Sequence, residues 1–134
     1  MRCRGFLITP DDLLPEGITP PHLFPIACFQ AGYLQAIKDY LSFHYKKNII
    51  LKVTSGYRNE QINKEVGGQP TSNHIYRLDD DYIRCASDIV PLNAPIEEVF
   101  GLLAPFQGEI YRHTQKGFIH IGQNGKTVKN HWVQ

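Results

Sequence analysis

The strongest periodic pattern in the chain is a helical one between residues 23 and 45. Apolar side chains recur there at steps of three and four positions, as Ile26, Tyr33, Leu34, Ile37, Tyr40 and Leu41. This spacing gathers them on one face of an α-helix, so residues 23–45 are predicted to form the main amphipathic helix. The preceding residues, 1–22, contain four prolines and predict an irregular arm that wraps the domain.

The rest of the chain alternates between short β-favouring runs and short helical patterns. The predicted strands cover residues 49–54, 88–90, 109–111 and 117–121. One predicted helix follows Asn59, a good cap, and stops at Gly67, and another begins near Pro95. Together these elements predict an α+β fold, in which a small, mainly antiparallel sheet packs on one long helix plus short helices.

Length and composition indicate one globular domain over residues 1–134. The chain is 42% hydrophobic and 20% charged, which is ordinary for such a domain. A net charge of +1 gives no general attraction to nucleic acid or to an anionic membrane, and no segment is apolar for long enough to span a bilayer. We therefore expect neither a nucleic-acid partner nor membrane insertion. The pattern predicts no particular oligomeric state.

The N-terminal residues do not have the pattern of a secretion signal. No apolar run of signal-peptide length follows Met1, and Asp11 and Asp12 arrive early. The sequence therefore predicts a protein without a signal peptide, located in the cytoplasm of the producing cell.

Residues that carry chemistry concentrate between Thr54 and Asp88 and recur once later. In order, the motifs are Ser55-Gly56-Tyr57-Arg58, Asn63-Lys64-Glu65-Val66-Gly67-Gly68, Ser72-Asn73-His74, Ala86-Ser87-Asp88 and Phe118-Ile119-His120-Ile121. Two neutral imidazoles and one carboxylate are the ligand set of an open zinc site, which keeps one position for water. Such a set is typical of a hydrolase.

In this order the motifs resemble those of the M15 peptidases, the zinc D-Ala-D-Ala carboxypeptidases and related peptidoglycan endopeptidases. The fold of that family is shared with the signalling domain of hedgehog proteins. The resemblance runs from about Phe6 to Gly122, and it implies that the sheet carries a Zn2+ site made by His74, Asp88 and His120. The implied substrate is a stem peptide of peptidoglycan. Without a leader, the protein would reach the cell wall by another route, as phage lysis and virion enzymes do.

The resemblance also implies roles for two residues outside the ligand set. Arg58, delivered by a strand end, would bind a substrate carboxylate or the developing oxyanion through its planar fork. Ser72 would support the site through hydrogen bonds.

An insertion separates this sequence from the family pattern. Residues 75–87 lie between His74 and Asp88, where the family has a short loop, and we expect residues 75–84 to form an inserted loop with a small hairpin at its flanks. Asp81 competes for the ligand role because it keeps the family's seven-residue step from His74. Asp88 is favoured because its neighbours are apolar, whereas Asp81 lies in an acidic run.

The position of the catalytic base is the second point at which this sequence departs from the family pattern. Many relatives have an acidic residue three positions before the last histidine or an aspartate two positions after it, and glycines stand here, at Gly117 and Gly122. The resemblance then makes His113 the first choice for the base and Glu109 the second. The alternative function is a zinc-stabilised module or virion component that binds cell wall without cleaving it.

Overall fold

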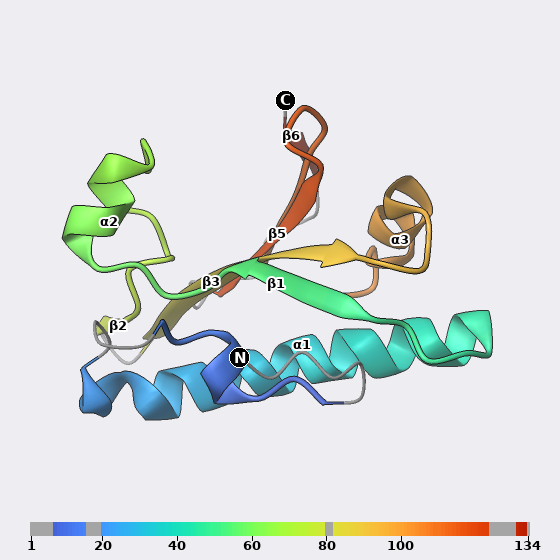
Figure 1. Cartoon of the computed structure of the whole chain (residues 1–134), viewed down its shortest axis with the longest axis horizontal. Coiled ribbons are helices and arrows are strands. Elements are labelled where there is room, and N and C mark those ends of the chain that lie inside the picture. Colours follow the sequence, from blue (N-terminus) through green and yellow to red (C-terminus); the bar gives the residue numbers. More distant parts are fainter. Residues whose placement is uncertain (1–6, 16–19, 80–81, 124–130, 134) are drawn as a thin grey trace.

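The structure is a computed structural model that describes residues 7–15, 20–79, 82–123 and 131–133. Two 3-10 turns begin this part, followed by three α-helices and six strands (Figure 1). In chain order the elements are η1 (Pro10–Asp12), η2 (Pro21–Leu23), α1 (Phe24–Tyr45), β1 (Leu51–Ser55), α2 (Glu60–Glu65), β2 (Arg77–Asp79), β3 (Tyr82–Pro91), α3 (Ile96–Leu102), β4 (Glu109–His113), β5 (Phe118–Gln123) and β6 (His131–Val133).

The strands form one sheet with the order β1-β3-β5-β4-β6, and β2 pairs with β3 beside this path. All the pairings are antiparallel except that of β6, which lies parallel to β4. The prediction of an α+β fold with a mainly antiparallel sheet and one long helix is therefore confirmed. No helix among the described residues is long and apolar enough to cross a membrane.

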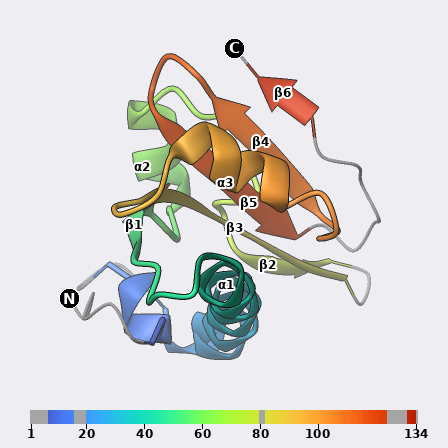
Figure 2. The same cartoon turned by 90° about the vertical axis from the view of Figure 1, so that its right-hand side faces the viewer.

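The two faces of the sheet have different compositions. Side chains of one face form the main core with α1 and α3, and the cluster contains Leu34, Ile37, Leu41, Ile89, Val99, Leu103, Ile110, Ile119 and Ile121. Figure 2 shows α1 end-on beside the sheet. Because side chains alternate along a strand, the neighbours of these core residues, among them Asp88 and His120, point to the other face. The sheet thus separates the core from the candidate site.

Helix α1 agrees closely with its prediction. It ends where Lys46 takes a left-handed conformation, with φ of 56°, and where the N–H of Lys47 donates to the carbonyl of Ser42. Gln30, which the hydrophobic pattern does not distinguish, is fully buried against the sheet. Its Nε2 donates to Ser87 Oγ at 2.9 Å and to the carbonyl of Ile121 at 2.9 Å. A polar side chain therefore ties the long helix to two central strands.

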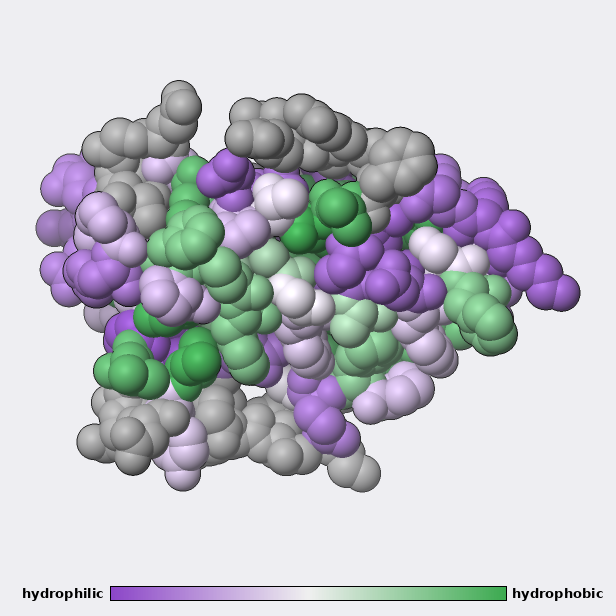
Figure 3. All heavy atoms as spheres, turned by 90° about the horizontal axis from the view of Figure 1, so that it is seen from below, coloured by the Kyte–Doolittle hydropathy of each residue, from purple (hydrophilic) through white to green (hydrophobic). Residues whose placement is uncertain are grey.

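The outer face of α1 carries exposed aromatic residues, namely Phe24, Phe29, Tyr40 and Phe43. Figure 3 views the molecule from this side and shows hydrophobic side chains intermixed with hydrophilic ones.

The described part of the N-terminal arm packs against the domain, as expected. Leu13 is 1% exposed and belongs to the main core. Its carbonyl accepts a hydrogen bond of 2.8 Å from the backbone N–H of Tyr57. A Cβ on Gly56 would lie 2.3 Å from the same carbonyl oxygen, so the glycine of the Ser-Gly-Tyr-Arg turn permits this close approach. The arm thus fixes the position of the turn that precedes Arg58.

The inserted segment differs from its prediction in register and extent. The hairpin pairs Arg77 with Arg84 and Leu78 with Ile83, rather than beginning at Ile75, and β3 starts at Tyr82 instead of at Asp88. Tyr76 does not pair in the hairpin because its side chain is buried: it is 3% exposed and packs edge-on against the Tyr57 ring. The insertion is therefore a strand extension rather than a separate loop.

Candidate metal centre

Four neighbouring strands each contribute one residue to a row across the face opposite the core. The register pairs Ser55 with Asp88, Asp88 with His120, and His120 with Tyr111. A bulge in β1 between Val53 and Ser55 brings Ser55 into this row. The carboxylate and the imidazole are thus neighbours because of strand pairing, although they lie far apart in the sequence.

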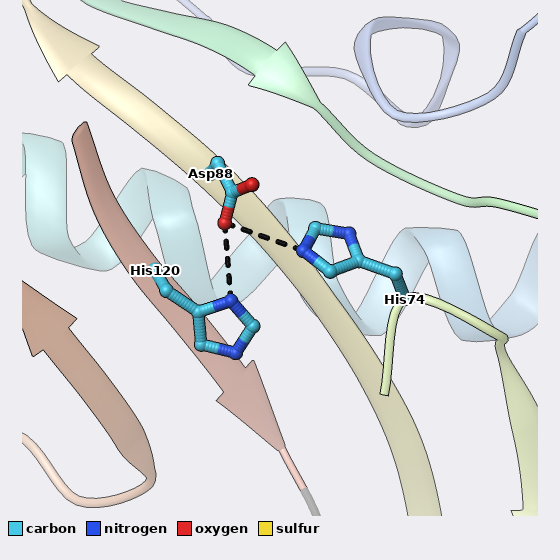
Figure 4. A group of neighbouring side chains, drawn as sticks. All are labelled: His74, Asp88 and His120. Carbon is cyan, nitrogen blue, oxygen red and sulfur yellow. Dashed lines mark hydrogen bonds and ion pairs between the residues drawn. The ribbon is translucent and has the colours of Figure 1, made fainter. Parts of the chain in front are cut away.

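His74 comes from the loop before β2 and points at the same carboxylate (Figure 4). Its backbone N–H donates to Ser72 Oγ at 3.2 Å, and its carbonyl accepts from the N–H of Arg58 at 2.7 Å. The ring Nδ1 lies 2.7 Å from the carbonyl oxygen of Gly56 and therefore carries a proton, which leaves Nε2 to face the site. Ser72 thus contacts the backbone of the ligand candidate.

Three donor atoms converge at this point. Oδ1 of Asp88 lies 3.2 Å from Nε2 of His74 and 3.0 Å from Nδ1 of His120. The donor atoms of the three residues all lie within 4.8 Å of one another. Ligands bound to zinc at about 2.0–2.1 Å with tetrahedral angles are roughly 3.3 Å apart, so the side chains fit such an ion.

The charges in this cluster are coupled. Burial alone would raise the pKa of Asp88, but hydrogen bonds with His120 and His74 hold it well below its usual range. Burial alone would lower the pKa of His120, but the carboxylates of Asp88 and Glu109 outweigh it and raise the pKa to about 9. A buried negative charge at Asp88 therefore attracts cations, either a protonated ring or a metal ion.

Arg58 lies beside the cluster in a defined orientation. Its NH2 is 3.6 Å from Asp88 Oδ2, its Nε donates to Ser55 Oγ at 3.2 Å, and its NH1 donates to Asn63 Oδ1 at 3.2 Å. Asn63, which the sequence placed in a motif without a role, is 2% exposed and also donates to the carbonyl of Gln69 at 2.7 Å. A Cβ on Gly68 would lie 2.1 Å from Asn63 Oδ1, so the second glycine of the motif leaves room for this amide.

A comparison with protein families identifies the family to which this chain belongs. The model described as Peptidase M15 matches residues 16–122. The chain belongs to the M15 peptidase family. Comparisons with curated proteins and with solved structures give no match.

Peptidases of the M15 family are metal-dependent and act on peptides, so His74, Asp88 and His120 form a possible metal site in this M15 peptidase. The competing ligand candidate, Asp81, lies outside the described residues. That Asp88 rather than Asp81 binds the ion stays a prediction, and the register of β3 and β5 supports it.

The two candidates for the base of this M15 peptidase lie on β4, on the same face as the donor cluster. Glu109 Oε1 is 3.1 Å from His120 Nε2, and Tyr111, between the two candidates, stacks on the His120 ring with centroids 5.5 Å apart. His113 is further along the strand, and its ring packs on Phe118 with centroids 4.5 Å apart. Glu109 therefore touches a ligand candidate directly, whereas His113 does not share this contact.

A cavity of about 790 Å3 opens next to Arg58. Its walls come from the N-terminal arm, from the end of β1 and from α2, and they include Asp11, Leu14, Val53, Ile62 and Val66. A volume of this order can hold part of a peptide. The sequence alone did not indicate this space, because the N-terminal arm, which is distant in the chain from β1 and α2, forms one of its walls.

Proposed function

We propose that this chain is a zinc-dependent peptidase that hydrolyses a peptide bond in peptidoglycan stem peptides, as a D-Ala-D-Ala carboxypeptidase or as an L,D- or D,D-endopeptidase. The convergence of His74, Asp88 and His120 beside Arg58 carries this proposal. Family membership supports the peptidase activity. The resemblance of the motifs supports the choice of substrate.

His74, Asp88 and His120 would hold the zinc ion. When bound, zinc acidifies a coordinated water and polarises a carbonyl group. Arg58 presents a guanidinium that is already oriented by Ser55 and Asn63, so it binds a substrate carboxylate or an oxyanion without reorganising. The cavity next to Arg58 accommodates the part of the substrate that carries this carboxylate.

The proton from the attacking water needs an acceptor, and we propose His113 first and Glu109 second. Burial lowers the pKa of His113, so its ring is neutral at pH 7 and can accept a proton. The protonated ring then donates to the leaving amine. Ser72 supports the site by accepting from the backbone of His74.

A second candidate function follows from the glycines at positions 117 and 122. If neither His113 nor Glu109 transfers a proton, the domain binds zinc and cell wall without cleavage. Gly122 lies opposite Glu109 in the pairing of β4 and β5, and Gly117 lies in the turn that joins these two strands, so neither position supplies a carboxylate. The two functions make different predictions for the same substrate.

Incubation of purified peptidoglycan with the zinc-loaded protein, followed by mass spectrometry of the released peptides, tests the proposal. We expect loss of stem-peptide residues over time, no loss with His120→Ala, and a rate on the order of a hundredfold lower with His113→Ala at unchanged zinc content. Retention of intact stem peptides, together with co-sedimentation of the protein with peptidoglycan, would support the binding module instead. A fully active His113→Ala would move the base to Glu109.

A further inference from the structure

Glu109 and Asp88 approach His120 at its two different nitrogens. Oδ1 of Asp88 lies 3.0 Å from Nδ1, and Oε1 of Glu109 lies 3.1 Å from Nε2. The two nitrogens of an imidazole point in diverging directions, so only Nδ1 faces the donor cluster. The oxygen of Glu109 lies on the other side of the ring.

Gly122 makes this contact possible. It pairs with Glu109 across β4 and β5, two residues after His120. A Cβ at this position would lie 2.7 Å from Glu109 Oε1 and 3.1 Å from His120 Nε2. Any other residue would therefore displace the carboxylate or the ring, and the glycine that replaces the expected aspartate leaves space for a carboxylate from the neighbouring strand.

His74 has the same arrangement with a different acceptor. Its Nδ1 lies 2.7 Å from the carbonyl oxygen of Gly56, and its Nε2 faces the cluster. In each ring, one nitrogen is bonded to an oxygen outside the cluster and the other is directed into it. An acceptor on the outer nitrogen fixes the tautomer and the orientation of a metal-binding imidazole.

We propose that Glu109 is a positioning residue for the metal: it accepts the Nε2–H of His120, directs the Nδ1 lone pair at the ion, and is accommodated by Gly122. The inference rests on the proposed zinc site. It assigns Glu109 to metal affinity rather than to proton transfer, which leaves His113 as the base.

The test measures the zinc dissociation constant of metal-free proteins by competition with a chromophoric chelator. Glu109→Ala removes the acceptor and is expected to weaken zinc binding by about 10- to 100-fold. Glu109→Gln keeps a carbonyl oxygen that can accept the same N–H, so it should retain more of the affinity than Glu109→Ala. Gln115→Ala, in the exposed turn between the same strands, is the matched control and should bind zinc like the wild type.

A second variant checks the role of the glycine. Gly122→Ala should weaken zinc binding as Glu109→Ala does. The double variant should bind zinc little worse than either single variant, because both changes remove the same contact between Glu109 and His120. Circular dichroism of the metal-free variants establishes that they are folded. Nitrogen-15 NMR of the zinc-loaded wild type should show the proton of His120 on Nε2 and the metal on Nδ1.

The outcomes separate the two proposals. A zinc affinity of Glu109→Ala within about twofold of the wild type, or metal bound at Nε2 of His120, would overturn the positioning role while leaving the zinc site in place. A wild type that binds no zinc would overturn both. If Glu109→Ala and Glu109→Gln bind zinc normally but lose the activity equally, Glu109 is the base.

Discussion

Asp88 is the residue that His74, His120 and Arg58 all contact. Its side chain is 5% exposed and meets His74, His120 and Arg58 within 3.6 Å. A carboxylate buried to this extent is stable only when cations or hydrogen-bond donors surround it. A metal ion bound here would therefore replace protons in a cluster that is already arranged around a negative charge.

The first prediction concerns the choice between the two aspartates. Asp88→Asn should weaken zinc binding by more than the roughly 100-fold that the loss of a supporting group can cost, because an amide carries no charge to offset the dication. Asp81→Asn is the matched control and should keep its zinc. Elemental analysis and chelator competition measure both variants, and the reverse result would make Asp81 the ligand.

The second prediction concerns pH. In the metal-free protein the pKa of His120 is raised to about 9, so the ring is charged at pH 7 and must lose a proton before zinc binds. Deprotonation of His120 should therefore make the zinc affinity increase about tenfold per pH unit between pH 6 and 8. Calorimetry in buffers of different ionisation enthalpy should detect at least one proton released at pH 7. A pH-independent affinity would show that His120 is neutral without metal or does not bind the ion.

At the scale of elements, β3 and α1 hold the site in place. Strand β3 pairs with β1, β2 and β5, and alternate residues of it face the core and the metal centre. Gln30 connects α1 to this strand through Ser87, the neighbour of Asp88. A buried polar contact therefore sets how the helix lies against the strand that carries the carboxylate.

The third prediction tests this connection. Gln30→Ala leaves a buried hydroxyl and a strand carbonyl without their donor and should lower the free energy of unfolding by about 1–3 kcal/mol. Phe43→Ala, on the outer face of the same helix and 85% exposed, should change it by less than about 0.5 kcal/mol. Urea unfolding of the metal-free proteins compares them. Equal effects of the two changes would contradict the role given to Gln30.

At the scale of the whole molecule, one core joins the N-terminal arm to α1, to α3 and to the central strands. The main cluster extends from Leu13 in the arm, through α1 and α3, to Ile121 in β5. A smaller cluster around Tyr57 and Tyr76 lies under the Ser-Gly-Tyr-Arg turn. Shared packing of this kind is the basis of cooperative unfolding in small domains.

The fourth prediction follows for the domain as a unit. The expectation of a single domain over residues 1–134 predicts one unfolding transition that different probes report alike. Leu13→Ala should shift that transition by about 2–5 kcal/mol, because it empties a fully buried site in the common core. A separate early transition in this variant would show that the arm folds independently.

Local patterns in the sequence were sufficient for the long helix, the α+β class and the ligand candidates. Helical periodicity depends on residues three and four positions apart, and α1 agrees with the predicted range within a residue at its start. Motif order led to His74, Asp88 and His120 because the chemistry needs these residue types. The strand at residues 82–91 was predicted at only its last part. Its first part pairs with Arg77–Asp79 rather than with Ile75 and Tyr76, and Tyr76 packs on Tyr57 instead, a long-range contact that no local pattern indicates.

The tertiary structure alone decided the contacts that depend on strand register. The bulge in β1 places Ser55 opposite Asp88, and the pairing of β4 with β5 places Glu109 opposite Gly122. A shift of one residue in either pairing would turn these side chains to the other face, and no local pattern distinguishes the two registers. The sequence by itself therefore determined which residues are candidates for a metal site, whereas long-range packing decided which groups lie against them.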